Sequence, residues 1–199
     1  MATPVEHFVD NMARVRALVG IFAAVKSVIT GAVDLSDILR AAVVLAVSAF
    51  DHYIHEIVRV RMLEVQAGRR LPTQSFSNFR VSMASVDEAL NFPSDNNWLE
   101  NEIRLNHGWQ SFQRPDNAAR AVSLISSIPL WDAVASKLGR NTGDVKRQLE
   151  LIVDRRNKIA HEADSDPTSP GSRWPIDETL VETAVAFLED IVTAIDALV

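Results

Sequence analysis

Basic, amide and imidazole side chains gather in one short segment of this chain. Positions 155–161 read Arg-Arg-Asn-Lys-Ile-Ala-His. Arginine and lysine bind phosphate groups, and arginine does so with two parallel hydrogen bonds. Histidine gains and loses a proton near neutral pH, so it can act as a general acid or base. These are the groups that would support chemistry at a phosphodiester without a metal ion.

Arg156 stands where an apolar residue is expected. The preceding apolar stripe runs through Val145, Leu149 and Ile152, its next position is Arg156, and positions 159–160 are apolar again. A guanidinium group on a stripe that faces the core is costly unless it pairs with a carboxylate or meets a polar ligand. The spacing alone therefore leaves two interpretations open, a buried ion pair and an anion-binding residue.

Asn157 and His161 are four residues apart and share one face of the expected helix. Arg156 and His161 are five apart, so their directions differ by about 140° around the helix axis. A helix that ends or kinks there would bring them closer, and Pro167 requires an end soon afterwards. The alternative is a structural role for His161 as a cap at the C-terminus of the helix.

Composition favours a single helical domain. The chain has 199 residues, 47% of them apolar but only 7% aromatic, with 7 Gly and 8 Pro. The absence of cysteine excludes disulfides, thiolate metal sites and a cysteine nucleophile. The net charge of −6 excludes a protein that coats nucleic acid over its whole surface, so a role with RNA must depend on a local cationic site.

In most of the sequence apolar residues recur with the period of a helix, and no segment shows the alternation of apolar and polar residues that is typical of a strand. Thr3, Gly139 and Asp177 are expected to cap helices, and either Asn141 or Thr142 is expected to begin one. We expect an all-α bundle with additional short helices. The expected helices span roughly 4–31, 34–68, 79–90, 98–105, 117–128, 129–139, 142–162 and 177–198, with a turn at 93–97 and a loop at 165–175.

The segment Ala41–Phe50 is apolar on every face except at Ser48. A helix of this kind is expected to be buried on all sides, either at the centre of the bundle or beneath a second subunit. Its longest apolar run, 41–47, is too short to span a bilayer. The N-terminal residues do not resemble a signal peptide. A cytoplasmic protein without membrane contact is the expectation.

The motif Arg-Asn-x-x-x-His at 156–161 resembles the signature of HEPN domains. The segments 39–45 and 50–53, the stretch 130–135 and the residues around the motif resemble the RiboL-PSP-type HEPN subgroup. The similarity covers roughly residues 35–198. We expect one domain over 1–199, with 34–68 and 129–198 its best-supported parts and 69–117 an insertion-like region.

The resemblance implies a homodimer in which two motifs form one composite ribonuclease site. Arg156 would stabilise charge on the phosphate, His161 would transfer protons, and Asn157 would orient His161 or the motif loop. Arg155 and Lys158 would contact the RNA substrate. The attacking group would be the ribose 2′-hydroxyl, so no cofactor or metal is implied.

The function predicted on this basis is a metal-independent endoribonuclease. It would serve as a toxin or effector in a bacterial defence or toxin–antitoxin system, with a possible antitoxin or sensor protein as partner. The alternatives are a non-catalytic HEPN dimer that binds RNA, a nucleotide or a protein, and a bundle in which Arg156 makes a structural ion pair.

Asp51 is predicted to support the site by pairing with Arg156 or by tuning His161, with a solvent-facing helix residue as the alternative. Asp51, His52, His55 and Glu56 also suggest a metal site, because two pairs among them are four residues apart. Those pairs lie on different faces of the helix and match no established zinc spacing. We therefore expect no metal there.

Overall fold

The computed structural model describes residues 2–30, 33–92, 95 and 97–199. These residues form nine helices and no strand, which confirms the all-α prediction. Four helices are long: α1 (Pro4–Lys26), α2 (Ser36–Gln66), α8 (Thr142–Glu162) and α9 (Glu178–Asp196). Five are short: α3 (Gln74–Ser77), α4 (Met83–Asn91), α5 (Asn97–His107), α6 (Pro115–Val122) and α7 (Leu130–Leu138).

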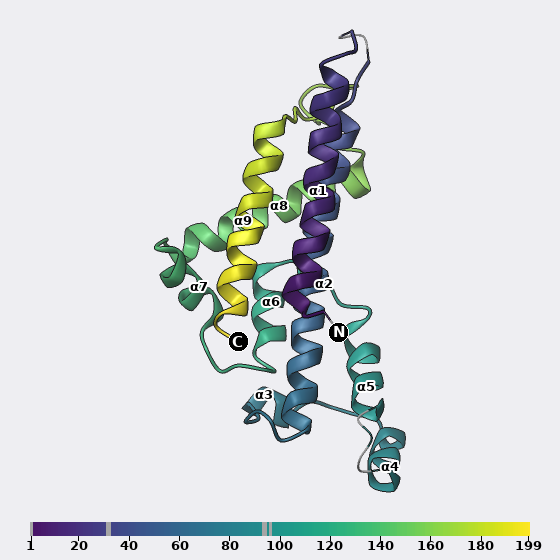
Figure 1. Ribbon diagram of the computed structural model, residues 1–199, viewed down its shortest axis with the longest axis vertical. Helices are drawn as coiled ribbons and strands as arrows, with labels where there is room; N and C mark the ends of the chain where they lie inside the picture. The colour runs from purple at the N-terminus through teal and green to yellow at the C-terminus, as the bar shows by residue number, and fades with distance from the viewer. Residues whose placement is uncertain (1, 31–32, 93–94, 96) are drawn as a thin grey trace.

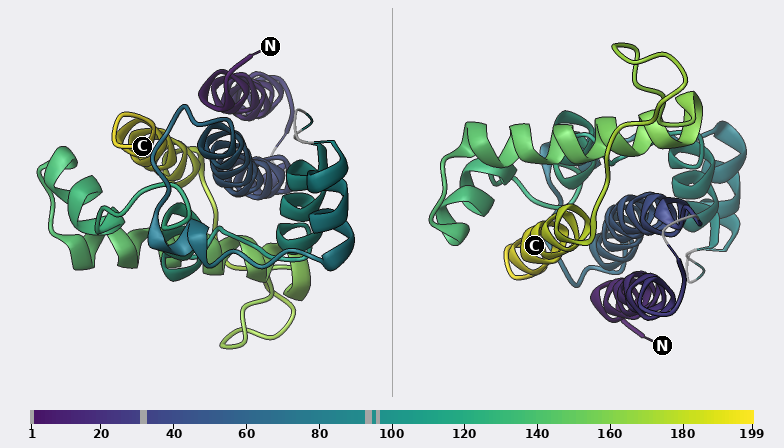
Figure 2. Two further views of the ribbon diagram at one scale, coloured as in Figure 1. Left: turned by 90° about the horizontal axis from the view of Figure 1, so that it is seen from below. Right: turned by 90° about the horizontal axis from the view of Figure 1, so that it is seen from above.

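The long helices build the framework of the molecule. α1, α2 and α9 run along its long axis, and α8 crosses them (Figure 1). Seen from either end, α2 lies between α1 on one side and α8 on the other (Figure 2). α2 is therefore the central helix, and the motif helix α8 forms one outer side of the bundle.

Local sequence signals set most of the helix ends. Thr3 accepts a hydrogen bond from the Glu6 backbone N–H, and the Glu6 carboxylate accepts one from the Thr3 N–H, which forms a capping box. Asp177 accepts from the Leu180 N–H at 2.8 Å, and Gly139 ends α7 in the left-handed conformation. These predicted caps are confirmed. Of the two predicted starts of α8, the side chain of Asn141 makes the cap.

Two boundaries differ from the predictions. α2 begins at Ser36 rather than at Asp34, because the Asp34 carboxylate accepts the Ser36 N–H at 2.8 Å from outside the helix. α1 ends at Lys26, while Gly31, where its end was predicted, lies outside the described residues.

The short helices between α2 and α7 follow the predictions only in part. α4 and α5 lie close to the predicted segments, α6 is shorter and begins earlier, and the four-residue α3 was not predicted. The turn predicted at 93–97 falls largely on residues outside the described part of the chain. α4 and α5 lie together beside the end of α2 that is remote from α8 (Figure 1).

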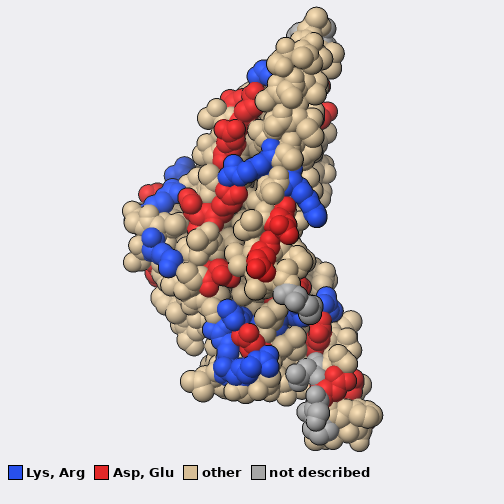
Figure 3. Space-filling view, viewed as in Figure 1, with Lys and Arg blue, Asp and Glu red and all other residues tan. Residues whose placement is uncertain are grey.

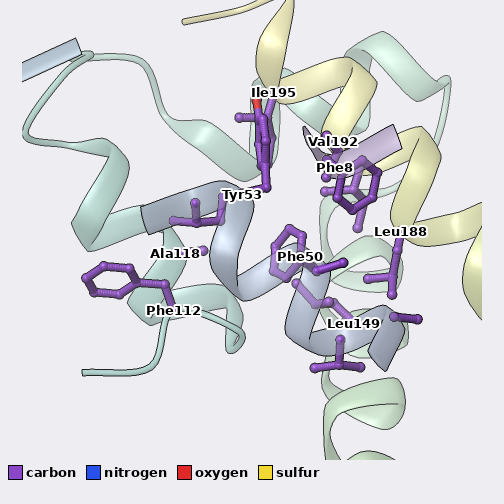
Figure 4. Packing of buried hydrophobic residues seen from close by; sticks show 14 of the residues in the cluster. Phe8, Phe50, Tyr53, Phe112, Ala118, Leu149, Leu188, Val192 and Ile195 are labelled. Carbon is purple, nitrogen blue, oxygen red and sulfur yellow. The ribbon is translucent and has the colours of Figure 1, made fainter. Parts of the chain in front are cut away.

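The core forms where α1, α2, α8 and α9 meet. Phe50 and Tyr53 of α2 lie among apolar side chains of α1, α8 and α9, and Phe8, Leu149 and Leu188 are also buried (Figure 4). By length and mean hydropathy α2 could cross a membrane, but 56% of its most apolar window is buried inside the bundle. That burial is typical of the core helix of a helical domain.

The prediction that Ala41–Phe50 is buried on every face is wrong for a single chain. Ala41, Leu45 and Ser48 are exposed on the side of α2 that α1, α8 and α9 leave open, and Leu45 is 48% exposed. The neighbouring helices cover only the opposite, broader face. Cover by a second subunit stays a prediction.

Candidate functional site

The motif segment occupies the last part of α8. Val145, Leu149 and Val153 are fully buried and fix this helix against the core. Arg156 follows on the same stripe and is half-buried, as its position in the sequence predicts. The residues of the motif are therefore carried by a rigid, well-packed helix rather than by a loop.

The guanidinium group of Arg156 has a single hydrogen-bonding partner among the described residues. Its Nη1 donates to Oδ1 of Asn157 at 3.0 Å. Its Nε is buried and has no partner in the described part of the chain, and no carboxylate there lies within ion-pair distance. The interpretation of Arg156 as a member of a structural ion pair therefore finds no support in one copy of the chain.

Arg155 has the partner that Arg156 lacks. Its Nη2 donates to the carboxylate of Asp164 at 2.8 Å and to the backbone oxygens of Trp174 and Pro175, each at 3.1 Å. Burial lowers the pKa of Arg155, and the nearby charge of Asp164 partly opposes this effect. Arg155 was predicted to contact substrate, but its side chain is committed to contacts within the chain.

His161 lies in the last turn of α8 and its side chain is exposed. The structure does not bring it to Arg156 within one copy, because the two residues point in directions about 140° apart on a regular helix. The ring makes no hydrogen bond with the described residues, so it is free to meet a substrate or another subunit.

Lys158 lies between the two key residues of the motif and is half-buried. Its Nζ lies 5.2 Å from the centroid of the Trp174 ring, which is a cation–π contact. The loop 165–175 thus covers one side of α8 at the level of Lys158. Asn157 is half-buried and holds Arg156 rather than His161.

Asp51 does not pair with Arg156 in the structure. Its carboxylate accepts the backbone N–H of Phe112 at 2.5 Å and the hydroxyl of Ser111 at 3.5 Å. It therefore fixes the loop between α5 and α6 to α2. In one copy of the chain the half-buried carboxylate of Asp51 meets one backbone N–H and one hydroxyl in place of the predicted pairing with Arg156.

The four residues that suggested a metal site point to different partners. His52 is exposed, the ring of His55 packs against Phe112 at 4.3 Å between centroids, and Glu56 pairs with Arg59 at 2.7 Å. Across the described ranges, no group of three or more His, Asp or Glu side chains is arranged to hold a metal ion. These side chains serve packing and ion pairing.

His107 is a titratable residue that sequence reasoning did not single out. It is 6% exposed and packs against His55, Phe79 and Phe112. Burial, and to a smaller extent His55, lowers its pKa to about 4. The ring is therefore neutral at physiological pH and belongs to the aromatic core between α2 and α5.

An apolar groove lies on the other side of α8, between α8 and α9. Its volume is about 510 Å³, and its lining includes Leu151, Ile152, Leu180 and Ala184. Leu151 is 60% exposed and Leu180 is 40% exposed. The groove is an apolar hollow on the surface of the bundle, with two exposed leucines at its edge.

The face formed by α1 and α9 carries charges of both signs (Figure 3). Arg16 pairs with Glu189 and Lys26 pairs with Glu178 at 3.0 Å, whereas Arg14 contacts the side-chain oxygen of Asn11 at 3.4 Å. This face offers no continuous basic surface along the two helices.

The helical bundle described above covers nearly all of a match to a known protein family. Residues 13–199 match the RiboL-PSP-HEPN family, and the chain belongs to that family. HEPN domains are typically associated with ribonuclease activity. No curated protein and no solved structure shows significant similarity to the chain.

Proposed function

We propose that this chain is a metal-independent endoribonuclease whose catalytic residues are Arg156, Asn157 and His161. The observation that carries the proposal is the contrast between two neighbouring arginines. Arg155 is ion-paired with Asp164, whose carboxylate also binds Arg40, whereas Arg156 has only an amide partner among the described residues. A half-buried guanidinium without a carboxylate partner and an exposed imidazole on the same helix together suit a phosphodiester substrate.

The reaction needs a nucleophile that the RNA itself provides. The ribose 2′-hydroxyl attacks the adjacent phosphorus while His161 accepts or donates the transferred proton, and the bond from phosphorus to the 5′-oxygen breaks. The products are a 2′,3′-cyclic phosphate and a 5′-hydroxyl end. Arg156 stabilises the negative charge that develops on the phosphoryl oxygens. Asn157 holds the guanidinium of Arg156 in place.

The proposed active form is a homodimer. One copy does not bring Arg156 to His161, so a complete site needs a second motif. The side of α2 that carries Ala41 and the half-exposed Leu45 is uncovered in one chain, and it provides an apolar surface for a second copy. Two copies of Arg156 and Lys158 in one cleft would also create a basic site on an acidic protein.

A role as a toxin or effector in a bacterial defence or toxin–antitoxin system accompanies this activity. A free ribonuclease endangers the cell that makes it, so an antitoxin or sensor protein would hold it inactive.

The apolar groove between α8 and α9 favours a second candidate function, a dimer that binds a protein partner without catalysis. Exposed Leu151 and Leu180 support that alternative.

One experiment separates the two functions. Purified protein is incubated with end-labelled single-stranded RNA in EDTA, and the ends of the fragments are analysed. The proposal expects cleavage with 2′,3′-cyclic phosphate or 3′-phosphate ends. Cleavage that appears only after a metal ion is added would contradict the mechanism, and a dimer that cuts no RNA would favour the binding module.

A further inference from the structure

Three charged side chains converge directly behind the motif. Asp164 is completely buried, and its Oδ2 accepts hydrogen bonds from Nε of Arg40 at 2.7 Å and from Nη2 of Arg155 at 2.8 Å. Arg40 is only 6% exposed although it lies near the start of α2. This cluster, the Arg40–Asp164–Arg155 triad, joins α2 to the end of the motif helix.

The triad holds an unusual helix end. Ala163 and Asp164 both adopt the left-handed conformation, with φ of 50° and 57°, although neither is glycine. This conformation is unfavourable for alanine and uncommon for aspartate, so tertiary contacts help to maintain the pair. The Asp164 N–H donates to the Lys158 carbonyl at 2.9 Å, which closes α8 directly after Glu162. His161 is thereby fixed in the last turn.

The same arginines hold the far end of the loop that follows. The carbonyl of Trp174 accepts from Nη2 of Arg40 at 2.9 Å and from Nη2 of Arg155 at 3.1 Å. The Trp174 N–H donates to the carbonyl of Asp164 at 3.0 Å. Both ends of the 164–174 loop therefore meet at the triad, which also places the Trp174 ring beside Lys158.

We infer that Arg40, Asp164 and Arg155 are positioning residues that set the direction of His161 and Lys158 for RNA cleavage. The inference rests on the proposed function. The triad defines where α8 ends and which side of its last turn the loop covers. Arg155 thus acts through the helix end and not by contact with phosphate. Without the triad, the left-handed pair would relax and the last turn of α8 would fray or lengthen.

Asp164→Asn is the first test, because asparagine tolerates the left-handed conformation but carries no charge. The matched control is Arg59→Met. Arg59 makes a comparable ion pair on α2, 2.7 Å from Glu56 and 3.2 Å from Glu100, but lies about 28 Å farther along the helix than Arg40. Asp164→Asn is expected to lower kcat at least tenfold with KM changed less than twofold. Arg59→Met is expected to leave both unchanged.

Wild-type kcat in Asp164→Asn would overturn the inference. Arg40→Lys covers the case in which that variant does not fold, because lysine retains the charge but loses the forked geometry of the guanidinium group. It is expected to lower kcat in the same way, and normal kcat in folded Arg40→Lys would equally contradict the inference.

RNA binding decides whether Arg155 contacts phosphate. In the His161→Ala background, which binds without cutting, the affinity for single-stranded RNA is measured at several salt concentrations. Loss of one phosphate contact reduces the slope of log affinity against log salt by about 0.7. Arg156→Met should show this reduction and Arg155→Met should keep the full slope. An equal reduction in both variants would make Arg155 a substrate ligand and overturn its assignment.

The triad can also be tested if the wild-type protein cuts no RNA. In that case the proposed function fails, and amide NMR shifts report on the triad alone. Asp164→Asn should shift the resonances of residues 157–164 and of Trp174, whereas Arg59→Met should leave them in place. Unchanged resonances in Asp164→Asn would show that the triad does not position the motif.

Discussion

The side chains of Arg155 and Arg156 leave α8 about 100° apart and meet opposite environments. Arg155 reaches the buried carboxylate of Asp164 at 2.8 Å, and Arg156 reaches only the amide of Asn157 at 3.0 Å. Arg155 is bound within the helix end. Arg156 carries a charge that no carboxylate in the described part of the chain neutralises. This division separates the residue that supports the helix end from the residue proposed to bind phosphate.

His161→Ala is expected to abolish cleavage without destabilising the protein. The ring is exposed and makes no hydrogen bond with the described residues, so its loss should change Tm by no more than about 2 °C. His7→Ala is the matched control, because His7 is also an exposed helical histidine but lies on α1. Cleavage that survives in His161→Ala would refute the proposed chemistry.

Arg156→Met is expected to lower kcat about 10²- to 10³-fold, which is typical for the loss of one group that stabilises charge in a transition state. Stability should be unchanged or slightly higher, since methionine removes a half-buried charge that has no carboxylate partner among the described residues. Kinetics and thermal unfolding check both expectations. A large fall in Tm would indicate that Arg156 has a structural role.

Leu45→Glu is expected to convert a dimer into monomers and to abolish activity. A carboxylate at the centre of the proposed interface would be buried without a partner. Light scattering at micromolar concentration gives the mass, and Leu105→Glu is the control, since Leu105 is 71% exposed on α5. A wild-type monomer with full activity would eliminate the composite site.

His107 predicts a specific dependence of stability on pH. Its pKa is about 4 in the folded state and near 6.5 in the unfolded state, so the unfolded chain binds the extra proton between these values. Stability should therefore decrease as the pH falls from 6.5 towards 4, by about 3 kcal/mol at 1.36 kcal/mol per pH unit. His107→Phe should show a smaller decrease between pH 7 and 5 in chemical unfolding. Parallel curves for the two proteins would contradict this assignment.

The sequence predicted the helices and most caps, because these features depend on local patterns such as Thr3 with Glu6 and the glycine at 139. It also placed Arg156 on the stripe that faces the core. It could not show that Arg155 rather than Arg156 is the ion-paired residue. The position of the partner Asp164 depends on a left-handed turn, and the sequence has no glycine there to indicate such a turn.

Arg40 could have been found from the sequence. It lies between Leu39 and the apolar segment 41–47, so it breaks an apolar pattern in the same way as Arg156. Asp51, in contrast, has a partner that the sequence could not indicate. Its position near the apolar segment suggested the site, but its partner is a backbone N–H in a loop sixty-one residues away, which no periodicity indicates.

The helix end behind His161 has a consequence for synthesis of the chain. Arg40 and Asp164 are 124 residues apart, and Arg40 also donates to the carbonyl of Trp174, so these bonds form only after the chain has been made through residue 174. Contacts this distant in sequence close late in folding. A nascent chain that has not reached residue 174 carries the motif residues without this arrangement, so under the proposed function it would not cut the messenger that encodes it.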